Sequence, residues 1–191
     1  SGSLIVAVAF DLFEEAYLHT GLVVSGTGLI LGAAVFMVIT SAMDRWASGL
    51  GGLYLLASVT LDGVPENLAL GVGLIGKSWV DIAALLLAIF FSNLPESMAG
   101  AVDMRDDGRS RRFVLGVWGL TAAILTGVVL LGHEALRGIG DTPVAVARSV
   151  AAGAVIASLA EALMPQAYDR GGKVVAFATA LGFFVSFAVT R

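Results

Sequence analysis

GLVVSGTGLILGAAVFMVITSAM, residues 21–43, is an apolar stretch without a single charged side chain. A transmembrane helix needs roughly 20 predominantly apolar residues, so this stretch is long enough to cross a bilayer. Within it, Gly28 and Gly32 lie one helical turn apart, and such a pair of small residues permits close packing of membrane helices. The stretch therefore predicts a membrane-spanning helix packed closely against a neighbour.

The composition of the whole chain agrees with this prediction. Of its 191 residues, 58% are hydrophobic and 14% are charged, whereas soluble domains are about 25% charged. The net charge of −4 argues against nucleic acid as a partner, which requires a basic surface. The chain contains no cysteine, and this excludes thiolate metal sites and disulfides. A soluble enzyme is disfavoured for a different reason, because too few charged residues are present to cover a globular surface.

Counting the other uncharged runs predicts seven spanning helices in a single transmembrane domain, residues 1–191. The segments cover about 4–18, 21–43, 48–76, 82–102, 113–132, 149–168 and 174–190. The predicted fold class is all-α, a polytopic membrane helix bundle surrounded by the lipid bilayer.

The loops between these segments indicate an orientation. The 103–112 loop carries four arginines, and other loops on its side contain Arg45, Arg170 and Lys173. The opposite side is assigned Lys77, Arg137, Arg148 and the terminal Arg191. Because positively charged short loops favour the cytoplasmic side, the 103–112 loop is expected in the cytoplasm.

Two internal repeats are visible. The first, at an offset of 151 residues, relates segment 4–18 to segment 149–168. Its matching residues are Gly2, Ile5, Ala9, Leu12, Ala16, Tyr17 and Gly21 with Gly153, Ile156, Ala160, Leu163, Ala167, Tyr168 and Gly172. The second, at an offset of 30, relates Pro65-Glu66 to Pro95-Glu96. Both repeats join segments an odd number of crossings apart, which predicts inverted topology, as in many secondary transporters. The pattern also predicts a further helix ahead of Ser1.

Acidic residues inside the segments are the candidate functional groups, because an ionisable group at membrane depth is costly. Asp62 and Glu66 share one helix face. The next helix carries Ser92, Asn93 and Glu96, and the remaining segments add Asp11, Glu15 and Glu161. No lysine or arginine is expected at depth, so an internal salt bridge is predicted to be unavailable. Clustered carboxylates then require a proton, a metal ion, or the two in exchange.

Two prolines strengthen the case for Glu66 and Glu96. Pro65 and Pro95 directly precede these acids inside their segments. Each proline removes a helical hydrogen bond and frees the carbonyl one turn earlier. A freed carbonyl in a membrane must be satisfied, and lining a hydrated ion site is one way to satisfy it.

The motifs DGVPEN (62–67) and SNLPES (92–97) resemble the paired motifs on the fourth and fifth helices of ZIP (Zrt-, Irt-like) metal transporters. FDLFEEA (10–16) is similar to the second helix of that family, and EALMPQA (161–167) to the seventh. The resemblance implies that the seven segments are family helices two to eight. It also implies a transporter rather than an enzyme, set in a prokaryotic plasma membrane and moving divalent metal ions toward the cytoplasm.

The resemblance further implies a role for each acid. Asp62, Glu66 and Glu96 would form the main metal site, with Asn93 and Ser92 at a neighbouring position. Asp11, Glu15 and Glu161 would line the entry or exit path. The sequence departs from the family where Asp62 replaces a histidine. It departs again at Thr121-Ala122-Ala123, which stands where a sixth-helix glutamate often completes a binuclear site. A mononuclear site is therefore favoured.

The residues do not decide which metal is bound, and two other functions stay open. Oxygen donors alone favour Mn²⁺, Fe²⁺ or Mg²⁺, although Zn²⁺ and Cd²⁺ belong to the same substrate class and carboxylates bind zinc too. A non-transporting metal sensor or structural subunit is one alternative, because the family's histidines are lost. A cation/calcium exchanger is another, but its Pro-Glu copies lie far apart rather than on neighbouring helices. A homodimer is compatible with the resemblance.

Overall fold

The computed structural model describes residues 2–47, 52–75 and 79–190, and within α3 and α4 it describes only part of the side chains. Every element in these ranges is a helix, as predicted. In chain order they are α1 (Gly2–Val6), the π-helix η1 (Ala7–Glu14), α2 (Glu15–Ala47), α3 (Gly52–Gly73), α4 (Trp79–Asp106), α5 (Arg111–Leu136), α6 (Asp141–Ser158), the π-helix η2 (Leu159–Leu163), α7 (Met164–Gly171) and α8 (Val174–Thr190).

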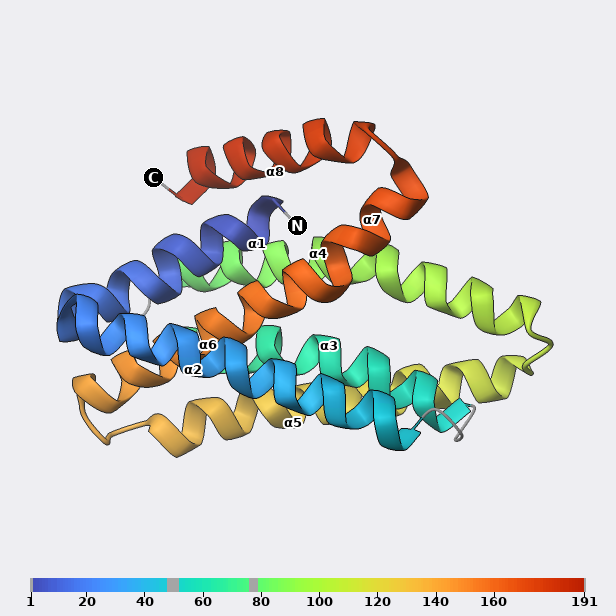
Figure 1. Ribbon diagram of the computed structural model, residues 1–191, viewed down its shortest axis with the longest axis horizontal. Coiled ribbons are helices and arrows are strands. Elements are labelled where there is room, and N and C mark those ends of the chain that lie inside the picture. The colour runs from blue at the N-terminus through green and yellow to red at the C-terminus, as the bar shows by residue number, and fades with distance from the viewer. Residues whose placement is uncertain (1, 48–51, 76–78, 191) are drawn as a thin grey trace.

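Helices α2, α3, α4 and α5 run back and forth along the long axis of the molecule, whereas α6 and α7 cross the bundle diagonally and lead up to α8 (Figure 1). Three stretches of the described residues are long and apolar enough to cross a membrane: Gly2–Arg45, Arg111–Leu136 and Asp141–Gly171. Val174–Ala188 is a shorter apolar helix. The chain thus has the helices of an integral membrane protein, while the count of seven spans stays a prediction.

The first of these stretches is a hairpin rather than one long span. Gly21 interrupts α2 with φ 74° and ψ 171°, a conformation that glycine adopts without the steric cost a Cβ imposes. The chain reverses direction there (Figure 1). The reversal falls between the residues predicted as segments 4–18 and 21–43.

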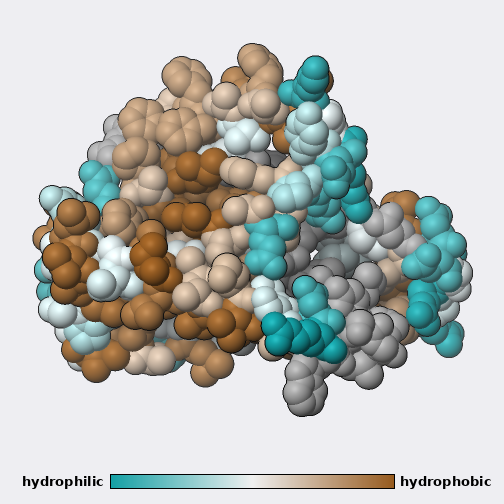
Figure 2. All heavy atoms as spheres, viewed as in Figure 1, coloured by the Kyte–Doolittle hydropathy of each residue, from teal (hydrophilic) through white to brown (hydrophobic). Residues whose placement is uncertain are grey.

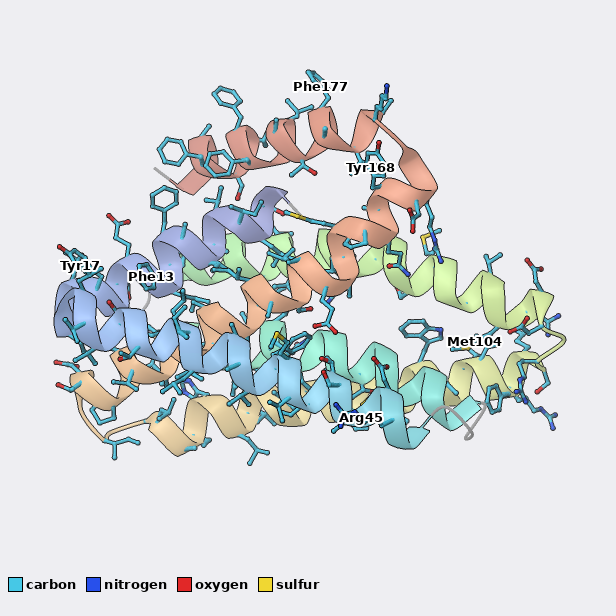
Figure 3. The ribbon with its side chains drawn as sticks, viewed as in Figure 1. Phe13, Tyr17, Arg45, Met104, Tyr168 and Phe177 are labelled. Carbon is cyan, nitrogen blue, oxygen red and sulfur yellow. The ribbon has the colours of Figure 1, made fainter. Side chains whose placement is uncertain are left out.

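Large apolar side chains cover much of the outer surface. On α2, Val23 is 77% exposed, and on α8 Phe177 is 71% exposed and points away from the bundle (Figure 3). Figure 2 shows the resulting apolar surface over most of one face. Soluble monomers rarely expose apolar patches of this extent, whereas lipid chains match them.

The most extensive helix contact joins α2 to α6. A Cβ added at Gly28 would meet Ser149, and one added at Gly32 would collide with the Val150 backbone carbonyl. From the other side, a Cβ at Gly153 would collide with the Leu29 carbonyl. The close packing predicted for Gly28 and Gly32 is confirmed, and glycines on both helices permit it.

The main core lies where η1, α3 and α6 meet. It includes Leu12, Ala69, Leu70, Ala152 and Val155. The two π-helices border this core, and they fall at matching positions of the first repeat, because residues 159–163 correspond to residues 8–12 at the offset of 151. π-Helical turns are uncommon and are frequent at functional sites, so their coincidence supports the relation between the two segments.

One boundary prediction is wrong. The segment predicted to begin at residue 149 begins at Asp141, directly after Gly140, whose φ of 99° ends the preceding turn. Pro143 lies in the first turn, where its missing N–H costs nothing. Arg148, assigned above to a loop, is consequently the eighth residue of α6, and only 6% of its surface is exposed.

Candidate functional site

Glu66 is the most deeply buried acid among the described residues, with 2% of its surface exposed. It lies on α3, which continues through Pro65 without a break. Next to it, the Asn67 side chain donates a hydrogen bond of 2.8 Å to the Gly63 carbonyl on its own helix. The amide of Asn67 is thus engaged locally, whereas the Glu66 carboxylate is enclosed inside an apolar bundle, where burying a charge is expensive.

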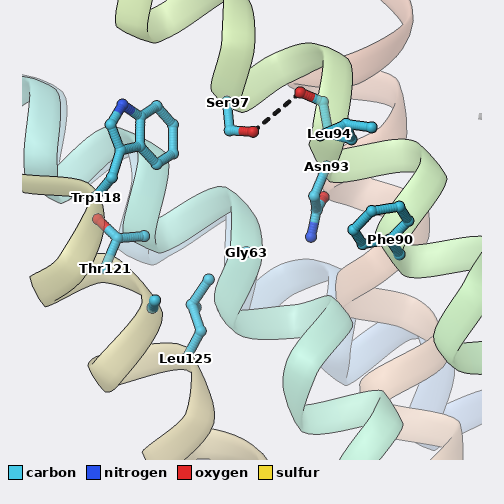
Figure 4. Close-up of a pocket in the computed structure, with 9 residues that line it drawn as sticks. Gly63, Phe90, Asn93, Leu94, Ser97, Trp118, Thr121 and Leu125 are labelled. Carbon is cyan, nitrogen blue, oxygen red and sulfur yellow. Dashed lines mark hydrogen bonds between the residues drawn. The ribbon is translucent and has the colours of Figure 1, made fainter. Parts of the chain in front are cut away.

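A cavity of about 280 Å³ lies between α3, α4 and α5, beside the helical turn that precedes Glu66 (Figure 4). Its lining residues are Gly63 from α3, Phe90, Asn93, Leu94 and Ser97 from α4, and Trp118, Thr121, Ala122 and Leu125 from α5. The lining is mostly apolar, with a few polar side chains on two facing helices. This is the usual composition of a small-ligand pocket.

The polar side chains of this cavity differ in how they are satisfied. The Ser97 hydroxyl donates to the Leu94 carbonyl at 2.9 Å. Thr121 Oγ1 and Trp118 Nε1 are buried and have no hydrogen-bond partner among the described residues. Thr121 thus belongs to the cavity wall. Buried polar atoms without partners are rare and call for a water, an ion or a functional reason.

Three predicted metal ligands cannot be placed beside Glu66. Asp62 belongs to α3, and Ser92 and Glu96 belong to α4, but their side chains lie outside the described residues. Among the side chains that the structure does describe, no three His, Cys, Asp or Glu residues form a group able to hold a metal. The cluster of Asp62, Glu66 and Glu96 therefore stays a prediction, and Asn93 is the one predicted neighbour found lining the cavity.

Glu15, predicted as a path residue, forms an ion pair with Arg148. Arg148 Nη1 contacts Glu15 Oε2, and Arg148 Nη2 donates to the Ile75 carbonyl at 2.7 Å. The expectation that no basic residue lies inside the segments, and that an internal salt bridge is unavailable, is wrong. Sequence reasoning missed Arg148 because it ended the segment at this charge. The sequence did contain a signal, because Ala145, Arg148 and Ala152 are three and four residues apart, as on one face of a helix. The structure buries all three.

The other two predicted path acids lie in the π-helices. Asp11 is half-buried in η1. Glu161 is exposed in η2, and its Oε2 accepts a hydrogen bond of 3.4 Å from the Thr40 hydroxyl of α2. Asp11 and Glu15 therefore lie about one helical turn apart, whereas Glu161 belongs to a different helix.

Glu161 adjoins a hydrophilic band on the surface. Figure 2 shows this band running from the turn between α7 and α8, across α7, toward the C-terminal end of α2. The exposed polar side chains there include Gln166, Asp169, Arg170 and Lys173, together with Asp44 and Arg45. Figure 3 places Arg45 at the lower end of the band. Three of these residues, Arg45, Arg170 and Lys173, are the ones that the sequence assigns to loops on the side of the 103–112 loop.

Comparison of the chain with protein-family models, curated proteins and solved structures finds no match.

Proposed function

We propose that the protein is a ZIP-like transporter of divalent metal ions. The carrying observation is Glu66, an acid buried to 2% exposure immediately after a proline within an apolar helix bundle. An ion path gives this buried acid a role, because ionisable residues inside membrane bundles commonly mark ion pathways. Resemblance to the ZIP motifs, carried by residues 62–67 and 92–97, supplies the substrate class.

The proposed site uses Glu66 with Asp62 and Glu96 as carboxylate ligands, and Asn93 and Ser92 as neutral neighbours. The cavity between α3, α4 and α5 supports this arrangement, since it brings Asn93 close to the turn of α3 that precedes Glu66. It also provides room for the water that a partly dehydrated cation retains. Thr121 takes no charge, which favours one metal ion over two.

In this proposal the bundle has seven spans arranged as inverted repeats, and its path connects the Glu15 end to the hydrophilic band at Glu161. The coincidence of the two π-helices at the 151-residue offset supports the repeat. The 103–112 loop faces the cytoplasm of a prokaryotic cell, so ions move from the Glu15 end toward that side. The exposed Glu161 and the buried Arg148 favour a conformation open toward the cytoplasm.

The test is metal influx into liposomes that contain the purified protein and a metal-sensitive dye. Glu66→Gln keeps the size of the side chain and removes its charge. Loss of a metal-ligating carboxylate should lower the initial influx of Mn²⁺, Fe²⁺ or Zn²⁺ beyond the roughly 10- to 100-fold that outer-shell changes cost. Glu96→Gln should act in the same way.

Glu134→Gln is the matched control, because the Glu134 side chain is 64% exposed near the end of α5. It should leave influx unchanged. Equal influx with and without the Glu66 carboxylate would contradict the proposal. Metal-dependent thermal stabilisation of the protein without any influx would instead support a non-transporting metal sensor.

A further inference from the structure

A second cavity, of about 510 Å³, lies beside the two π-helices and shares no lining residue with the cavity near Glu66. Its lining residues are Ile5 from α1, Val8, Ala9 and Phe13 from η1, Leu29 from α2, Ile156 from α6, Leu159 and Ala160 from η2, and Met164 from α7. All of these side chains are apolar, so we call this space the apolar cavity. Its volume is that of a small-ligand pocket, but its lining side chains offer none of the polar groups that usually orient a ligand.

The two walls of the apolar cavity are built from corresponding positions of the chain. Eight of its nine lining residues form pairs at the offset of 151 residues that relates segments 4–18 and 149–168: Ile5 with Ile156, Val8 with Leu159, Ala9 with Ala160, and Phe13 with Met164. Two of these pairs are identical, and the other two join large apolar residues. Contacts about a two-fold axis use the same positions on both sides, so this cavity has the form of a contact between related segments rather than of a local packing defect.

The apolar cavity reaches from the surface into the bundle. On its inner side Val8 and Leu159 are each 3% exposed, whereas Ile156 is 44% exposed at the surface. Ile30, which follows the lining residue Leu29 on α2, is 66% exposed. Figure 2 shows mostly apolar side chains to the left of the hydrophilic band. A lipid chain that lies on this surface can therefore enter the cavity without crossing a polar layer.

The chemistry of the lining decides what can fill this space. A buried water needs two to four polar partners, and these side chains provide none. An empty cavity is unfavourable in its own way, because its walls lose van der Waals contacts on one side. An apolar chain restores those contacts, and the bilayer that surrounds the helices supplies such chains at high concentration.

We propose that the apolar cavity is a binding site for one acyl chain of a membrane phospholipid. The chain inserts between η1 and η2 and contacts the matching positions of both, so that lipid joins the two segments where their side chains leave a space. This inference goes beyond metal transport and does not depend on it, because the site contains no ion ligand and its test uses no metal.

The test is photo-crosslinking in lipid nanodiscs that contain a phosphatidylcholine with a diazirine group near the end of one acyl chain. After irradiation, mass spectrometry of peptides locates the lipid adducts. Adducts are expected on Val8 and Leu159, which a lipid confined to the outer surface cannot reach. Val23, which is 77% exposed on α2, should be labelled as an ordinary lipid contact. Leu12, which is 1% exposed in the adjoining core and does not line the cavity, should stay unlabelled.

Substitutions that fill the cavity make the test specific. Ala9→Phe should lower the adducts on Leu159 at least about tenfold, and Ala160→Phe should do the same for those on Val8. An unfilled cavity costs the equivalent of about a tenfold change in binding for every roughly 60 Å³, and a phenyl ring takes at least that much room from the lipid chain. Ala34→Phe is the matched control, because Ala34 is exposed on α2 outside the cavity. It should leave both adducts unchanged.

Labelling of Val23 without adducts on Val8 and Leu159 would overturn the proposal, and this result needs no variant to fold. Adducts on Leu12 as abundant as those on Val8 would also overturn it, since lipid would then enter through general loosening of the bundle. Unchanged labelling in both filled variants would have the same consequence. None of these results bears on the influx test of Glu66, whose cavity has a separate lining.

Discussion

The contact between α2 and α6 differs from the contact among α3, α4 and α5 in what fills the space between the helices. In the first, glycines bring backbone against backbone, so that a Cβ at Gly32 or Gly153 would collide with a carbonyl of the opposite helix. In the second, a cavity of about 280 Å³ separates the helices. The first contact has no room to rearrange, whereas the second has room for water or an ion. We call the α2–α6 contact the frame, and the region among α3, α4 and α5 is the candidate site.

Gly32→Ala should have the largest effect on the fold. Its added methyl group meets the Val150 backbone, which cannot rotate away as a side chain can. Forced overpacking typically costs about 1–3 kcal/mol, and we expect the upper end here, seen as a strong loss of folded protein in detergent thermal melts. Gly119→Ala is the control, because nothing lies within 4 Å of a Cβ there and alanine is the better helix former. A Gly32→Ala protein as stable as Gly119→Ala would contradict the close contact.

The sequence alone predicts the frame well. Long uncharged runs are a direct consequence of the bilayer's thickness, so the helices and most of their boundaries follow from counting. The four-residue spacing of Gly28 and Gly32 is enough to predict their close contact with a neighbouring helix. Residues 174–190, predicted as the last segment, correspond to α8.

The candidate site is predicted less completely, because it depends on which faces meet. Glu66 is recognisable as buried from its segment and its proline. The pairing of Glu15 with Arg148 joins residues 133 positions apart, and no local pattern specifies such a contact. Thr121 and Trp118 likewise become cavity residues only through the packing of α5 against α4.

Asn93→Leu tests the second region. The substitution keeps the number and branching of the side-chain heavy atoms in the cavity wall and removes the amide. If Asn93 helps to hydrate or bind the ion beside Glu66, influx should fall about tenfold, at the lower end of the range for neighbours of metal ligands. Thermal stability should be kept, because an apolar side chain suits the mostly apolar lining. Leu94→Asn, on the same cavity, is a matched exchange that should not compensate when combined with Asn93→Leu. Unchanged influx in Asn93→Leu would mean that the cavity is not part of the ion path.

Gly63→Ala should have the smallest effect, and it sharpens the comparison most. A Cβ at Gly63 would lie 2.8 Å from Leu125 Cδ1, which is almost as short as the 2.7 Å from a Cβ at Gly28 to Ser149 Cβ. The two contacts differ in which atom stands in the way. The obstacle is the far end of a flexible side chain that borders the cavity, so Leu125 can rotate into open space. Relief of the clash and the better helix propensity of alanine should together hold the loss of stability below about 1 kcal/mol. Thermal melts beside Gly32→Ala measure this directly. Equal destabilisation by the two substitutions would mean that the cavity gives no freedom to move, and the distinction between frame and site would fail.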